Sequence, residues 1–233
     1  NNQVGGNTIL HNNNAKYIGN GYDVLYIANS GTISAKDNSS STAVRFLDSN
    51  NRSKLIISNS GLITAGINGQ AIYVDGSNLA QINNINGGQI IGSVNLGDNE
   101  NSYFNNTNKS SFIGNLTFGN ANQRLTVDNS SSWSGSIIGT GIVTINDNLS
   151  LKLDQSNSEP VTAEINGTSN GVGEVLINPN QSVAFAKSVG ATRSLANFNI
   201  SPDSTAILSD GVSISATNIG LSGNLDLQGV SGN

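Results

Sequence analysis

One pattern recurs three times in the sequence: Asn29-Ser30-Gly31-Thr32-Ile33, Asn59-Ser60-Gly61-Leu62-Ile63 and Asn86-Gly87-Gly88-Gln89-Ile90. Its asparagines lie 30 and then 27 residues apart. Asn-Gly and Ser-Gly pairs supply the positive φ angles that tight corners of the backbone require. Self-similarity at a spacing of this size is typical of architectures that stack one supersecondary unit on the next. The pattern therefore predicts a repeat protein.

Each repeat is followed by a second short apolar segment, at Val44 to Phe46, Ile72 to Val74 and Val94 to Leu96. The first two repeats are also preceded by apolar segments, at Tyr22 to Ala28 and Leu55 to Ser58. Strands of this length, with alternating apolar side chains, bury one face. A single unit cannot bury that face alone, but coils stacked about 4.8 Å apart can do so. We therefore predict an all-β fold, a right-handed parallel β-helix (β-solenoid) with protruding corner loops.

We expect one continuous domain over residues 1–233, with the clearest repeats in residues 22–100 and looser coils in residues 101–233. Apolar alternation continues into the second half of the chain, for example at Ile142 to Ile145 and at Leu225 and Leu227. The segment Val183 to Phe198 comes nearest to a helical pattern, but Gly190 interrupts it, and we interpret it as strand plus loop. We expect a protruding loop around Gln155 to Pro160. Because the chain begins without methionine, we expect it to be a fragment of a longer protein.

The composition excludes several classes of function. The chain has 39 Asn, 33 Ser and 27 Gly but only 25 charged residues, and its 36 % of hydrophobic residues argues against disorder. Ten scattered Lys and Arg residues form no basic stripe, so we expect no nucleic-acid partner and no binding to an anionic membrane surface. No apolar run of 18 residues occurs, so we expect nothing that spans a membrane. The absence of cysteine excludes disulfides and thiolate metal sites.

The asparagines at the corners have two interpretations. Identical amides stacked from coil to coil can hydrogen-bond in a ladder, and the candidates for this structural role are Asn29, Asn59 and Asn86. Alternatively, these residues only form exposed turns. Trp133, the single tryptophan, lies in a serine-rich stretch. It is a candidate surface contact for a sugar or a partner protein, or else a partly buried strand residue.

The chemically reactive residues give little support for catalysis, and we predict that the chain is not an enzyme, with no catalytic residue, no cofactor and no metal site. His11 is the only histidine and lies in a polar stretch. Carboxylates are the serious alternative, since parallel β-helices include carbohydrate-cleaving enzymes, whose sites need two acids close together. The nearest candidates are Asp98 with Glu100, Asp203 with Asp210, and Asp226 with its neighbours.

A further set of acids follows strands in similar settings, at Asp75, Asp98 and Asp128. Stacked from coil to coil, these carboxylates can form an acidic row or a weak calcium site. The alternative is that each one simply caps a turn at the end of its strand.

Several segments resemble a known family. The Asn-Ser-Gly-x-Ile units, Leu125 to Asn129 and Gly141 to Asp147 look like passenger domains of type V (classical) autotransporters. Val189 to Ala196 and Gly223 to Leu227 resemble, more narrowly, passenger segments of rickettsial outer-membrane surface antigens. The likeness covers nearly the whole chain, but it rests on degenerate repeats and therefore concerns the architecture more than the individual protein.

That resemblance implies export through the outer membrane by a C-terminal translocator and display at the bacterial cell surface. It also implies a role as an adhesin or structural stalk in host-cell or cell–cell contact. The partners would be a host-cell surface protein or glycan, or further copies of the passenger. The alternatives are a carbohydrate-active β-helix enzyme, a tail-spike fragment, or a secreted haemagglutinin-like passenger of the two-partner type.

Overall fold

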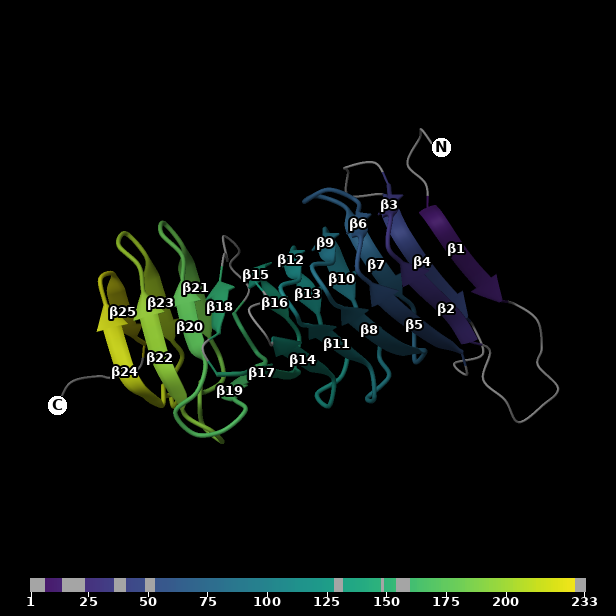
Figure 1. Cartoon of the computed structure of the whole chain (residues 1–233). Helices are drawn as coiled ribbons and strands as arrows, with labels where there is room; N and C mark the ends of the chain where they lie inside the picture. Colours follow the sequence, from purple (N-terminus) through teal and green to yellow (C-terminus); the bar gives the residue numbers. More distant parts are fainter. Residues whose placement is uncertain are drawn as a thin grey trace.

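The protein is a parallel β-solenoid, as the sequence predicts. The structure, a computed structural model, describes residues 7–13, 24–35, 41–48, 53–127, 132–147, 149–153 and 160–228. Within these ranges there are 25 strands and no helix, so none of them holds a helix that could cross a membrane. Figure 1 shows the strands as an elongated stack, with β1 (Asn7–Asn13) at one end and β24 (Ala216–Leu221) and β25 (Asn224–Leu227) at the other.

The strands form four sheets, and every strand pair is parallel. Sheet A contains β1, β4 (Thr42–Asp48), β7 (Gln70–Val74), β10 (Ser93–Asn95), β13 (Leu116–Thr117) and β16 (Ile137–Ile138). Sheet B contains β2 (Val24–Asn29), β5 (Lys54–Asn59), β8 (Leu79–Asn84), β11 (Tyr103–Asn106), β14 (Arg124–Val127), β17 (Ile142–Ile145) and β19 (Glu164–Gly167).

Sheet C is the longest and contains β3 (Thr32–Ser34), β6 (Leu62–Thr64), β9 (Gln89–Ile91), β12 (Ser111–Ile113), β15 (Ser132–Gly135), β18 (Ser150–Leu153), β20 (Glu174–Ile177), β22 (Leu195–Ile200) and β24. Sheet D contains β21 (Ser182–Phe185), β23 (Thr205–Leu208) and β25. In the first coils the chain passes from sheet A to B to C and then begins the next coil in sheet A. Each of these first coils thus has three faces, with one strand on each.

The strands bury alternate side chains. In β5, Leu55, Ile57 and Asn59 are buried, whereas the residues between them are half-buried. Period-two alternation of this kind places one set of side chains inside the coil and the other outside. The inward apolar side chains form one continuous core that runs from Ile27 to Leu208.

Sheet C shows how this core is built along the stack. Its central inward positions pair in register from Ile33 through Ile63, Ile90 and Phe112 to Trp133. The rings of Phe112 and Trp133 are stacked, with centroids 6.1 Å apart. Because each side chain packs on its counterpart in the next coil, the apolar column needs no other layer to cover it.

Coil length varies without breaking the sheets. Equivalent residues of sheet B lie 30, then 25, then 22 residues apart along the first four strands, and the offset has fallen to 18 between Arg124 and Ile142. The strands of sheet B keep their register, so the extra residues are accommodated at corners. The loop expected around Gln155 to Pro160 lies almost wholly outside the described residues, since 154–159 are not among them.

The later coils keep the same plan with fewer residues in regular strands. An isolated parallel bridge joins Val161 to Phe185, the last residue of β21 in sheet D. Two more bridges join Ile165 to Val189 and Val189 to Ile214. The segment Val183 to Phe198, predicted to be strand plus loop, contributes to β21 and β22, and the connection between them contains the bridged Val189.

Candidate functional site

A buried ladder of asparagine amides runs along the inner edge of sheet B. Asn29 donates from Nδ2 to Oδ1 of Asn59 at 2.7 Å, Asn59 donates to Asn84 at 2.8 Å, and Asn84 donates to Asn106 at 2.8 Å. All four side chains are buried, and three of them are completely inaccessible. The four residues end successive strands β2, β5, β8 and β11, so strand pairing places them directly above one another.

The amides of Asn29, Asn59 and Asn84 also donate to a backbone carbonyl at the start of the sheet C strand of the next coil. Asn59 Nδ2 also donates to the carbonyl oxygens of Gly61 and Gln89, at 3.2 and 3.1 Å, and Asn84 Nδ2 donates to the carbonyl of Ser111 at 2.9 Å. These three ladder residues therefore tie sheet B to sheet C as well as coil to coil. Because buried amides are stable only when hydrogen-bonded, this arrangement is a structural one and offers no group to a ligand.

The ladder contains Asn29 and Asn59 but not Asn86, which forms a turn at the corner, as the alternative interpretation has it. Asn86 lies in the corner after β8 with φ +53°, followed by Gly87 at φ +81°, and Asn84 takes the place in the ladder. The corner from Asn84 to the start of β9 is two residues longer than the corresponding corner after Asn59. If the repeats are aligned on their glycines, Asn86 corresponds to Asn59. Strand pairing instead places Asn84 next to Asn59.

Two ladder residues, Asn84 and Asn106, were missed for the same reason. Their signal is the position at the end of an alternating strand rather than the glycine that follows it. Beyond Asn106 the equivalent positions are Val127 and Ile145. The inward site at the end of these strands thus accepts either a hydrogen-bonded amide or an aliphatic side chain.

Trp133 is not a surface contact. It is fully buried (0 % exposed), and its Nε1 donates to the carbonyl of Gly114 at 3.3 Å. The reason is register: Trp133 pairs with Phe112, which occupies the central inward position of β12. The serines on either side suggest exposure, but alternation along β15 directs only every second side chain outward.

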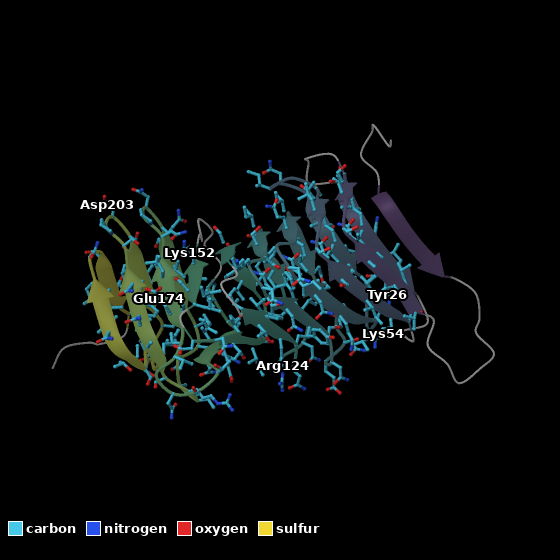
Figure 2. The ribbon with its side chains drawn as sticks, in the orientation of Figure 1. Tyr26, Lys54, Arg124, Lys152, Glu174 and Asp203 are labelled. Atoms are coloured by element: carbon cyan, nitrogen blue, oxygen red, sulfur yellow. The ribbon has the colours of Figure 1, made fainter. Side chains whose placement is uncertain are left out.

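Within the described part of the chain, no group of three or more His, Cys, Asp or Glu residues is arranged to hold a metal ion, so the candidate carboxylates form no such group. Asp203, labelled in Figure 2, lies in the corner before β23 with φ +58°, and Asp210 lies in the following corner. Asp128 and the side chain of His11 lie outside the described residues, although the backbone of His11 belongs to β1.

Asp75 lies beside an aromatic and a cationic residue on the outer side of sheet A. The Tyr73 hydroxyl donates to Asp75 Oδ1 at 3.3 Å, and the guanidinium carbon of Arg45 lies 5.5 Å from the centre of the Tyr73 ring. Burial raises the pKa of Tyr73 above its ordinary value, and the negative charge of Asp75 and the hydrogen bond to it raise this pKa further. Arg45 acts in the opposite direction, and Asp98 adds a smaller increase to the same pKa.

The corner between sheets A and B forms a groove that the sequence did not indicate. We call it the corner groove; it has a volume of about 340 Å³ and is lined by Glu100, Asn101, Ser102, Tyr103, Asn122 and Arg124. Tyr103 and Arg124 begin β11 and β14 and are direct partners in the sheet. Figure 2 shows Arg124 at the outer surface of the stack.

A buried glutamine holds the backbone of the corner groove. Gln123 is completely inaccessible, and its Nε2 donates to the carbonyls of Gly97 and Asn99 at 2.7 and 2.9 Å. Its Oε1 accepts from the backbone N–H groups of Gly119 and Asn120 at 2.9 and 3.3 Å. One side chain thereby fixes the corner loops of two successive coils.

Comparison with protein-family models, with curated protein sequences and with solved structures gives no match to the chain.

Proposed function

We propose that the chain is a non-catalytic stalk of a bacterial autotransporter passenger, displayed at the cell surface, whose lateral faces make adhesive contacts. The partner is a host-cell surface protein or glycan, or a neighbouring copy of the same passenger. The observation that carries this proposal is the single core beneath long parallel sheets, from Ile27 to Leu208. Such a stack resists bending, because bending would separate hydrogen-bonded strands on one side.

The outer side of sheet B supports the adhesive part of the proposal. Its outward positions pair in register from Ser58 through Asn83, Asn105 and Thr126 to Thr144. None of these side chains is charged, and each can both donate and accept hydrogen bonds. Asn105 Nδ2 already donates to Asn83 Oδ1 at 3.0 Å within the column. A flat column of this kind suits contact with another polar surface, including an identical one.

The cellular setting of the proposal comes from the resemblance to autotransporter passengers. The glycine-containing repeat units that carry this likeness lie at corners between sheets B and C, where they allow the coils to stack. A passenger that folds coil by coil after export would need local nucleation, which repeat stacks provide.

The proposal is tested with the purified, fluorescently labelled chain. We expect saturable binding to cultured epithelial or endothelial cells by flow cytometry, or concentration-dependent association by sedimentation velocity. Replacing the outward Thr126 and Thr144 together by lysine should weaken this contact, whereas Thr117→Lys on sheet A serves as the matched control. A folded chain that stays monomeric and binds no cell type saturably would refute the adhesive role.

A further inference from the structure

We propose that the corner groove binds a sugar unit that carries a carboxylate group, such as a uronic or sialic acid within a glycan. This inference rests on the adhesive function proposed above and names a ligand class and a site for it. Its main residues are Arg124, Tyr103, Glu100 and Asn122.

Arg124 supplies the charge that a carboxylate would need. Its side chain is exposed, and within the described part of the chain no hydrogen bond or ion pair occupies its guanidinium. Guanidinium groups bind carboxylates through two parallel N–H···O bonds, and such charge-assisted bonds are about twice as strong as neutral ones. The groove thus presents an unused fork of donors to the solvent.

Tyr103 supplies an aromatic neighbour on the same wall. It is half-buried and pairs directly with Arg124 across β11 and β14, so the two side chains lie next to each other on the outer face of sheet B. A tyrosine combines an apolar ring face with a hydroxyl that hydrogen-bonds, which matches a sugar ring and its hydroxyl groups. A carboxylate on Arg124 would therefore hold the ring of the sugar near Tyr103.

The residues just before Tyr103 and Arg124 in the chain offer complementary polar groups. Asn122 Nδ2 donates to Glu100 Oε2 at 3.3 Å, a long and exposed hydrogen bond that a sugar hydroxyl can replace. Glu100 then accepts from a hydroxyl, and the amide of Asn122 donates to one. Because Glu100 gives the groove a single negative charge beside the single positive charge of Arg124, the groove does not suit a polyanion such as nucleic acid, which requires several cations.

The frame of the groove is fixed before any ligand binds. Gln123 holds both corner loops through its buried amide, and Ser102, also buried, accepts the backbone N–H of Ala80 at 2.9 Å. A preorganised site loses less conformational entropy on binding than a flexible one. Its volume of about 340 Å³ lies at the small end of the range of ligand pockets, about 300–1,000 Å³, which suits a short sugar unit.

The test measures binding of small glycosides to the purified chain by saturation-transfer NMR and titration calorimetry. Methyl glucuronide is compared with methyl glucoside, which has the same ring with a hydroxymethyl group in place of the carboxylate. A methyl sialoside is titrated in parallel, to show whether the groove binds a uronic acid or a sialic acid. We expect at least one acidic glycoside to bind at least tenfold more tightly than methyl glucoside. Equal binding of acidic and neutral sugars, or no binding of either acid, would overturn the inference.

Variants locate the site. Arg124→Gln should weaken binding of the acidic glycoside at least tenfold, and Tyr103→Ala should weaken it as well, each in a chain whose circular dichroism is unchanged. Lys152→Gln is the matched control, because it removes an exposed cation from sheet C, away from the groove (Figure 2). Binding that survives Arg124→Gln at full strength would contradict the proposed site.

The same samples separate this inference from the proposed function. If the chain binds cells or itself but no acidic sugar, the groove inference fails and the adhesive function stands. If the acidic glycoside binds through Arg124 while the chain neither binds cells nor self-associates, the groove inference stands and the adhesive function fails.

Discussion

Replacing Asn59 by alanine should destabilise the fold by about 3 kcal/mol, since a buried donor or acceptor left without a partner costs about 1–3 kcal/mol. The substitution removes the donor to Asn84 Oδ1, which is inaccessible to water, and also the donor to the carbonyls of Gly61 and Gln89. Asn29 Nδ2 loses one acceptor but still donates to the carbonyls of Gly31 and Leu62, so the free-energy cost at Asn29 is smaller.

The matched control lies one residue before the next ladder position. Asn83 is an asparagine on sheet B with its side chain on the outer face, where it accepts one hydrogen bond from Asn105. Asn83→Ala should therefore cost less than about 1 kcal/mol. The double variant Asn59→Ala/Asn84→Ala should be less destabilised than the sum of its single variants, because the two residues share one hydrogen bond.

The assay is equilibrium unfolding in urea followed by far-ultraviolet circular dichroism, with hydrogen exchange to locate the loss. Repeat stacks can unfold in more than one step, so exchange is needed to show that the effect of Asn59→Ala centres on the coils of β5 and β8. If Asn59→Ala were no more destabilising than Asn83→Ala, the ladder would contribute nothing to stability and the reasoning would be refuted.

Three further predictions concern packing and titration. A Cβ on Gly61 would lie 2.1 Å from the carbonyl oxygen of Gly31, so Gly61→Ala should lower the urea midpoint strongly, whereas Gly31→Ala, with no atom within 4 Å, should leave it nearly unchanged. Phe198→Ala should lower the free energy of unfolding by about 3–5 kcal/mol. Ile219 pairs with Phe198 in the next coil and is 46 % exposed, so Ile219→Ala should lower it by less than half as much in the same assay. Because the pKa of Tyr73 is raised in the folded state, the fold is stabilised while this phenol is neutral. The stabilisation is complete below the unfolded-state pKa of about 10 and is lost as pH rises through the folded-state pKa. If the free energy of unfolding fell equally above pH 10 in Tyr73→Phe and in the unchanged chain, this prediction would be contradicted.

The strands of the first coils could be predicted closely because their signal is local. The segment predicted at Leu55 to Ser58 lies within β5, and that at Ile72 to Val74 lies within β7. Short alternating apolar runs bounded by glycine and asparagine specify strand and corner without reference to distant residues. The same signal also specified β17, which spans the segment predicted at Ile142 to Ile145 and buries Val143 and Ile145.

The ladder and the buried tryptophan could be predicted only in part. Whether Asn84 or Asn86 faces Asn59 depends on how many residues the corner inserts, and a corner of either length is compatible with the glycine pattern. For Trp133, the sequence left open a surface contact or a partly buried strand residue, and the register of β15 in the sheet decides that the side chain is fully buried.

The sequence by itself determined that this chain forms short strands separated by tight corners and that the strands stack in parallel, because spacing and side-chain alternation are properties of neighbouring residues. Only the tertiary structure decided which residues of different coils lie above one another. Register fixes the partners of Asn59 in the ladder and brings Arg124 beside Tyr103, 21 residues earlier in the chain. A groove made from two coils has no local signature, because its geometry depends on the number of residues in each corner between them.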